Sequence, residues 1–107
     1  MQAHVLIDRL NTQYSVAVRV KLQAEVAVSP WSKWFTVPVV SYIETASTGP
    51  YPIREVEWVE VNPFVVENRG RLIMPRMLNY EQQIREAFEA EKIRFEQIGL
   101  VFRIYLP

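Results

Sequence analysis

Residues 14–28 read YSVAVRVKLQAEVAV, and this stretch alternates strictly between two kinds of side chain. Every even position from Val16 to Val28 is apolar. The polar residues all stand at odd positions, namely Ser15, Arg19, Lys21, Gln23 and Glu25. Because successive side chains of a strand point to opposite faces, the pattern predicts one long strand over 14–28 with one apolar and one polar face.

The next segment, WSKWFTVPVVSYIET (31–45), is rich in aromatic and β-branched residues, and it is also predicted to be a strand. The residues between the two strands, SPWS (29–32), suit a four-residue loop. Pro30 would then stand at the second position of a type I turn, where its fixed φ is favourable. The sequence therefore predicts a long antiparallel hairpin that joins 14–28 to 31–45.

The predicted loop also fixes the pairing register of this hairpin. It pairs Val28 with Lys33 and Val26 with Phe35, so that the apolar faces of the two strands coincide. One continuous apolar ribbon results. The residues at its far end are the predicted contacts with a protein partner, namely Trp31, Trp34, Phe35, Val26 and Val28.

The rest of the chain completes a predicted α+β fold. From Asn79 the apolar period becomes helical, which predicts one C-terminal helix over about 80–98 that ends before Gly99. This helix is expected to pack on a mainly antiparallel, strongly twisted sheet within a single domain, 1–107. The other predicted strands are 3–10, 53–61, the hairpin 64–67 with 71–74, and the final strand 100–106.

The predicted ribbon is too long for a chain of 107 residues. Residues 15–28 would span roughly 45 Å if straight, whereas a domain of this length has a diameter of roughly 35 Å. The predicted helix covers only about 28 Å of it. The strand could bend at a bulge near Gln23 and Ala24, curl with a twisted sheet, or project with 31–37 as a two-stranded arm. A bend or a loop could cover the remainder, but a second copy of the chain would do so most simply, so the sequence favours self-association over a monomer.

Composition excludes several classes of function. The formal net charge is zero, so no long-range field collects nucleic acid or anionic membrane. The chain has no cysteine, which excludes disulfides, thiolate metal sites and cysteine nucleophiles. No signal peptide or membrane-spanning run stands out, so we expect a soluble protein of the cytoplasm or of a virion, without a membrane partner.

A second hypothesis is a module that binds single-stranded nucleic acid. Aromatic rings interleaved with cations on a strand can stack on bases and contact phosphates. The residues in this pattern are Arg19, Lys21, Lys33 and Trp34, with Trp31 beside them. A separate basic patch lies near the predicted turn of the second hairpin and contains Arg69, Arg71 and Arg76.

A third hypothesis is a small-molecule or metal-binding enzyme that would use Glu55, Glu57 and His4 beneath the loop 46–52. No catalytic or metal motif accompanies these residues, so the sequence assigns no catalytic, cofactor-binding or metal-ligating residue and no cofactor. The leading hypothesis is a non-enzymatic interaction or assembly protein that forms homo-oligomers through the ribbon. A subunit of a larger phage, virion or bacterial assembly would have this architecture.

Overall fold

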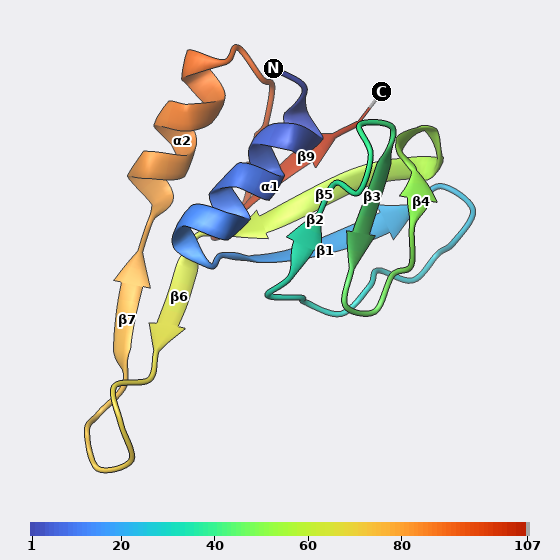
Figure 1. Ribbon diagram of the computed structural model, residues 1–107. Helices are drawn as coiled ribbons and strands as arrows, with labels where there is room; N and C mark the ends of the chain where they lie inside the picture. Colours follow the sequence, from blue (N-terminus) through green and yellow to red (C-terminus); the bar gives the residue numbers. More distant parts are fainter. Residues whose placement is uncertain (107) are drawn as a thin grey trace.

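The computed structural model describes residues 1–106 and has two helices and mostly antiparallel strands, which confirms the predicted α+β class (Figure 1). The main sheet has four strands in the order β1-β5-β9-β8, and all its neighbouring strands are antiparallel. These strands are β1 (Ala17–Leu22), β5 (Val56–Asn62), β9 (Val101–Tyr105) and β8 (Glu96–Ile98).

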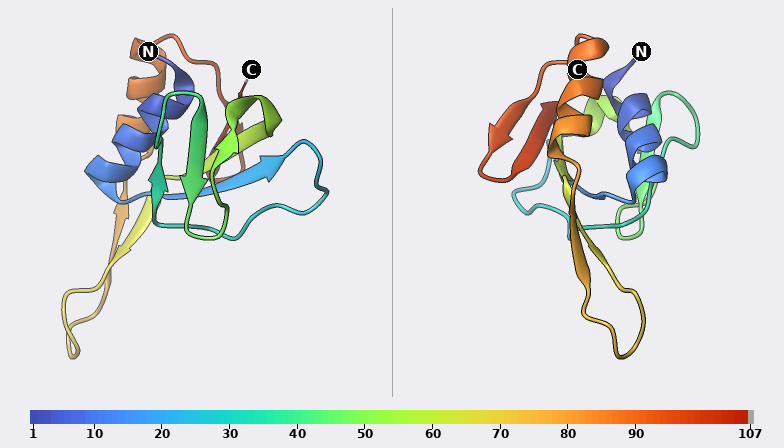
Figure 2. Two further views of the ribbon diagram at one scale, coloured as in Figure 1. Left: turned by 45° about the vertical axis from the view of Figure 1, so that its right-hand side comes forward. Right: turned by 90° about the vertical axis from the view of Figure 1, so that its left-hand side faces the viewer.

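The two helices, α1 (Ala3–Tyr14) and α2 (Glu81–Ala90), lie side by side over one face of this sheet (Figures 1 and 2). Alternate residues of the strands supply the apolar side of the core, as period-two patterns require. The core residues from the sheet are Val18, Val20, Val59, Val61, Phe102 and Ile104. The helices add Leu6, Ile7, Leu10, Ile84 and Phe88.

Two smaller sheets complete the fold. The first contains β2 (Phe35–Thr36), β3 (Tyr42–Thr45) and β4 (Tyr51–Pro52), and a short 3-10 helix (Ile53–Glu55) leads from it into β5. The second contains only β6 (Phe64–Glu67) and β7 (Arg76–Asn79). These two strands and their loop extend away from the body (Figure 2), and residues 64–79 are called the arm below. The longest dimension of the molecule is 45 Å.

The prediction of a strand over 3–10 is wrong, because these residues belong to α1. Leu6 and Ile7 are both buried. A strand would send such neighbours to opposite faces, whereas a helix places residues 6, 7 and 10 on one face. The helix ends at Tyr14, and the next residue, Ser15, caps it with φ of 58° and donates its backbone N–H to the carbonyl of Asn11 at 2.9 Å.

The predicted long hairpin is shorter than expected and has another register. The strand of 14–28 ends at Leu22, and its main partner is β5 rather than 31–45. Residues 29–32 do return antiparallel to β1, but Val18 exchanges backbone hydrogen bonds with Ser32 at 2.8 Å. The predicted pairs therefore do not form. Beyond Leu22 the chain has no partner strand, because β5 begins only at Val56.

The C-terminal helix exists but ends at Ala90 instead of residue 98. Lys92 takes a left-handed conformation with φ of 57°, and Ile93 donates its N–H to the carbonyl of Phe88 at 2.9 Å. This is the geometry of a helix C-terminus. Continued helix would have turned Ile93 outward, whereas here Ile93 and Phe95 pack against the core.

The remaining strands are close to their predicted positions. β9 lies within the predicted strand 100–106, one residue inside each end. β5 begins three residues after the start of the predicted strand 53–61, because residues 53–55 form the 3-10 helix, and it ends one residue later than predicted. The second hairpin begins at Phe64 as predicted. Its return strand is 76–79 rather than 71–74, so its connecting loop is longer than the predicted turn.

Candidate functional site

Several large apolar side chains of the arm are exposed to solvent. Leu72 is 98 % exposed and Met74 is 80 % exposed, and both lie in the loop at its tip. Val66 and Met77 are cross-strand partners on the arm, and both are exposed as well. An isolated two-stranded hairpin is marginally stable in water. Contiguous exposed apolar patches are typical of protein–protein interaction sites.

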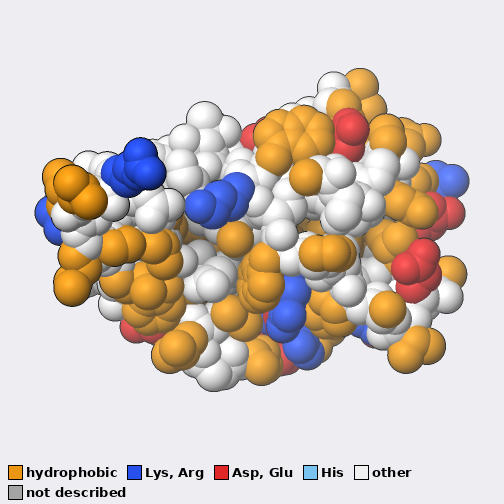
Figure 3. Space-filling model, turned by 90° about the horizontal axis from the view of Figure 1, so that it is seen from below, with side chains coloured by type: hydrophobic (Ala, Val, Ile, Leu, Met, Phe, Trp, Pro, Cys, Tyr) orange, Lys and Arg blue, Asp and Glu red, His pale blue; other side chains and the backbone are white. Residues whose placement is uncertain are grey.

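Arginines surround this apolar tip. Arg76 forms an exposed ion pair with Glu67 at 2.8 Å, and Arg69 donates from Nη2 to the carbonyl of Met74 at 3.0 Å. Arg71 stands beside Gly70, which has a positive φ in the turn. Figure 3 views the molecule from below and shows apolar side chains gathered at its left end, beside Lys or Arg side chains. The tip is therefore both apolar and cationic.

Of the predicted contact residues, Val26 and Val28 lie on the loop after β1, away from the arm, whereas Trp31 and Trp34 flank Ser32, which pairs with Val18. Val26, on the loop that follows β1, is 96 % exposed. Val28, Trp31 and Trp34 are each exposed over about a third to a half of their surface. Phe35 is different, because it is only 2 % exposed and belongs to the core. Phe35 is thus unavailable to a partner, while the other residues remain accessible.

The predicted nucleic-acid residues are only partly brought together. Arg19 and Lys21 lie on β1, and the guanidinium carbon of Arg19 is 4.5 Å from the ring centroid of Trp31. Lys33 lines a separate hollow at the base of the arm, with Tyr14 and Tyr80 among its neighbours. Within residues 1–106, no ion pair or cation–π contact joins Trp34 to the cations of β1.

Both cations of β1 form ion pairs with carboxylates of β5. Lys21 Nζ lies 2.6 Å from Glu57 Oε2. Arg19 Nε donates to Glu60 Oε1 at 2.7 Å, and Arg103 Nε donates to the other oxygen of Glu60 at 2.8 Å. Glu60 is completely buried. Lys21 and Glu57 cancel each other, whereas two arginines share the one carboxylate of Glu60 and together retain one net positive charge.

The Arg19–Glu60–Arg103 row runs across three neighbouring strands on the sheet face opposite the core. The guanidinium carbon of Arg103 lies 4.2 Å from the ring centroid of Trp58, so an indole stacks near each arginine. A hydrogen bond with Tyr105 raises the pKa of Arg103, burial opposes this, and Glu60 raises it further. The row is a packed electrostatic network that locks β1, β5 and β9 together.

Sequence reasoning did not find this network. Glu60 and Trp58 stand two residues apart on β5 and therefore share the sheet face opposite the core. A glutamate on that face is normally exposed to water. Its two arginine partners come from strands 41 and 43 residues away in the chain. The one available signal was the tryptophan beside the glutamate, since a buried indole on a strand indicates that the face is covered.

The residues of the third hypothesis lie apart from one another. His4 is buried on α1, where its Nε2 bonds to the carbonyl of Val40. Glu55 lies in the 3-10 helix, and Glu57 pairs with Lys21. Residues 1–106 contain no group of three His, Cys, Asp or Glu side chains placed to hold a metal ion. In the same residues, no helix is long and apolar enough to cross a membrane.

Comparison with known proteins gives one match. A family model described as "Family of unknown function (DUF6678)" matches residues 5–106, which include the helices, the main sheet and the arm. No curated protein matches the chain, and no solved structure matches it. Because the family model extends over nearly the whole chain, the protein belongs to the DUF6678 family.

Proposed function

We propose that the protein is a non-enzymatic interaction protein that self-associates through the arm, residues 64–79. The observation that carries this proposal is the exposure of Leu72 and Met74 at the tip of a hairpin whose base packs against the core through Val65 but whose loop extends into solvent. Covering such side chains stabilises a complex by roughly 25 cal/mol per Å² of apolar surface removed from water. The arm is thus proposed as an association surface in addition to the one predicted at the long hairpin, which stays a prediction.

Charge supports a second copy as the partner. The arm carries Arg69, Arg71 and Arg76 against the single acidic residue Glu67. The next segment, 81–96, carries five glutamates against three cations, and Glu86 and Glu89 are exposed on α2. Two arms would repel each other, whereas the arm of one copy and α2 of another attract. The proposed contact is therefore head-to-tail, which permits chains or rings of copies.

Light scattering across a concentration series tests the proposal. We expect the mass of the wild-type protein to rise with concentration. The double substitution Leu72→Glu with Met74→Glu should shift this rise to at least about tenfold higher concentration, since tenfold corresponds to only about 1.4 kcal/mol. Val26→Glu is the matched control, because Val26 is equally exposed but lies on the loop after β1.

The control separates the two association surfaces. Val26→Glu should leave the mass unchanged. A wild-type monomer at high micromolar concentration would overturn self-association. A loss of association in Val26→Glu, with the arm variant unaffected, would return the interface to the loop after β1.

Mixing two variants tests the head-to-tail geometry. The arm variant keeps its α2, and a second variant, Glu86→Lys with Glu89→Lys, keeps its arm. Each variant alone should stay monomeric, and an equimolar mixture should form a one-to-one dimer. An arm-to-arm interface predicts instead that the α2 variant associates normally by itself.

A further inference from the structure

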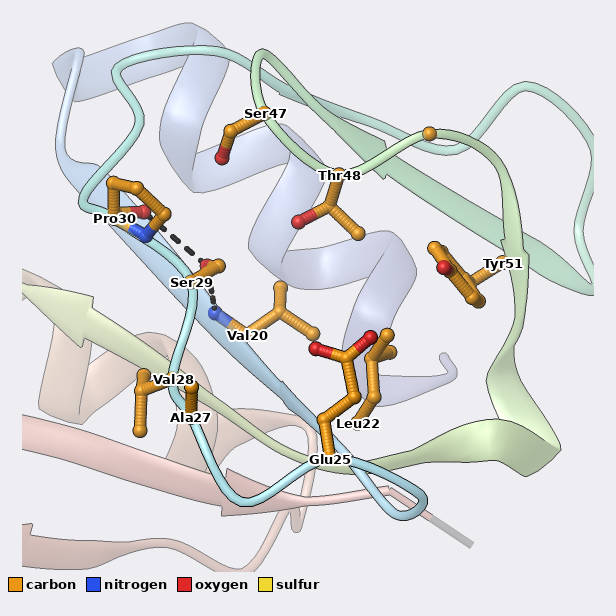
Figure 4. A pocket seen from close by; sticks show the side chains of 11 residues that line it. Val20, Leu22, Glu25, Ala27, Val28, Ser29, Pro30, Ser47, Thr48 and Tyr51 are labelled. Carbon is orange, nitrogen blue, oxygen red and sulfur yellow. Dashed lines mark hydrogen bonds between the residues drawn. The ribbon is translucent and has the colours of Figure 1, made fainter.

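A cavity of about 270 Å³ lies between β1, the loop 23–30 and the loop 46–50 (Figure 4). It is independent of the arm and of the proposed function. Its apolar lining comes from Val20 and Leu22 on β1 and from Val28 on the first loop. Pockets for small molecules are typically apolar hollows with a few polar groups that fix orientation.

Three oxygen-bearing side chains are directed into this cavity from the two loops (Figure 4). Glu25 comes from the first loop, and Ser47 and Thr48 come from the second. Within residues 1–106, Glu25 has no ion pair, and the hydroxyls of Ser47 and Thr48 have no hydrogen-bond partner. Glu25 is also the only charged residue of the lining.

Thr48 stands on backbone that is held by hydrogen bonds, whereas Glu25 and Ser47 are exposed at the mouth of the cavity. Thr48 is only 8 % exposed, and its backbone bonds to Thr45 through both N–H and C=O at 3.0 and 2.9 Å. On the opposite wall, the Ser29 hydroxyl accepts a hydrogen bond from the N–H of Val20 at 2.9 Å. Side-chain hydrogen bonds therefore hold both loops around the cavity. The oxygens without a partner among the described residues, from Glu25 on one loop and from Ser47 and Thr48 on the other, lie on opposite sides of it.

We infer that this cavity binds a small organic ammonium ion. A primary ammonium has three N–H donors and no acceptor. It therefore matches a carboxylate and two hydroxyls that need donors, while the carbon skeleton of the ligand covers Val20, Leu22 and Val28. The carboxylate of Glu25 selects the charge, since hydrogen bonds to an ionised acceptor are roughly twice as strong as neutral ones. The volume of the cavity restricts the ligand to a small one.

The test is an NMR titration of the full chain with phenethylammonium as the probe. We expect shifts of the backbone amides of Glu25, Ser47 and Thr48. The neutral analogue 2-phenylethanol should bind at least about tenfold more weakly, because it lacks the charge. The isosteric substitution Glu25→Gln should weaken phenethylammonium binding by at least about tenfold as well.

Glu55→Gln is the matched control, because Glu55 lines the neighbouring hollow with Glu25 but not this cavity. It should leave the affinity for phenethylammonium unchanged. A thermal melt of each variant confirms that it is folded. The inference is overturned if the amides around the cavity do not shift, if 2-phenylethanol binds as tightly, or if Glu25→Gln binds like the wild type. None of these results bears on association through the arm.

Discussion

Residues 14–34 and the arm, 64–79, have similar sequence patterns but differ in their place in the fold. The first segment joins the main sheet, whereas the second leaves the body of the protein. Both contain runs of β-branched and apolar residues interrupted by turn residues. In the first segment, β1 becomes an edge strand of the main sheet, and residues 29–32 fold back along it. In the second, β6 and β7 pair only with each other and leave the body.

The difference lies in what covers each strand. Val18 and Val20 of β1 face α1, α2 and the small sheet, and both are buried. Val66 and Met77 of the arm have no element over them and are exposed. Alternation in a sequence thus indicates a pleated backbone with one apolar face, but the elements that reach that face decide whether it is core or surface.

The largest expected contrast between these regions concerns two glutamates that each pair with arginine. Glu60→Ala removes the two charge-assisted hydrogen bonds that Glu60 accepts from Arg19 and Arg103, and it should lower the free energy of unfolding by about 3–5 kcal/mol. Glu67→Ala removes the exposed pair with Arg76 and should cost less than about 1 kcal/mol. Urea unfolding followed by tryptophan fluorescence measures both. Equal losses would mean that water reaches Glu60.

A smaller contrast is expected between two valines. Val20→Ala removes two buried methyl groups and should cost about 2–3 kcal/mol, which combines lost burial with a cavity. Val66→Ala, on the exposed arm, should cost less than about 0.5 kcal/mol. The measurement is urea unfolding at a concentration where light scattering gives a monomer. A large loss for Val66→Ala would show that the arm is already packed in a single copy.

The smallest contrast concerns two side chains that anchor loops. Ser29→Ala deprives the N–H of Val20 of the hydroxyl that faces it, and it should cost about 1 kcal/mol. Arg69→Ala removes an exposed hydrogen bond to Met74 at the arm tip and should cost less than about 0.5 kcal/mol. Amide hydrogen exchange should show faster exchange at Val20 in the first variant and unchanged exchange in β1 in the second. The reverse pattern would contradict the assignment of Ser29 as an anchor.

Local patterns predicted much of the fold. The period change at Asn79 located α2, and the alternation of 100–106 located β9. The helix α1 was missed because His4, Leu6 and Leu10 also fit a strand pattern, and only tertiary packing separates the two periods. The partner of β1 was missed because strand order depends on the whole chain: β5, 34 residues beyond Leu22, takes the position assigned to 31–45.

The candidate binding surfaces were harder to predict from the sequence than the fold was. The sequence predicted more apolar surface at the long hairpin than one helix covers, but β1 ends at Leu22 rather than at Val28. Association through that hairpin stays a prediction, and the exposed side chains of the arm lie in a segment to which the sequence assigned no association surface. The arginines of the arm were noticed as a basic patch, but the exposure of Leu72 depends on a loop longer than the predicted turn. The burial of Glu60 requires Arg19 and Arg103 from distant strands, and no local pattern contains that information.

The arm leaves and rejoins the body at one place, since Phe64 and Asn79 are cross-strand partners. Lengthening a loop whose ends are already held together costs only about 0.6 kcal/mol for each doubling. Natural variants can therefore change the reach of this hairpin, or exchange its tip altogether, while every residue beneath it keeps its neighbours. The same property makes the hairpin a suitable position for grafting a peptide or an optical label onto an otherwise unaltered scaffold.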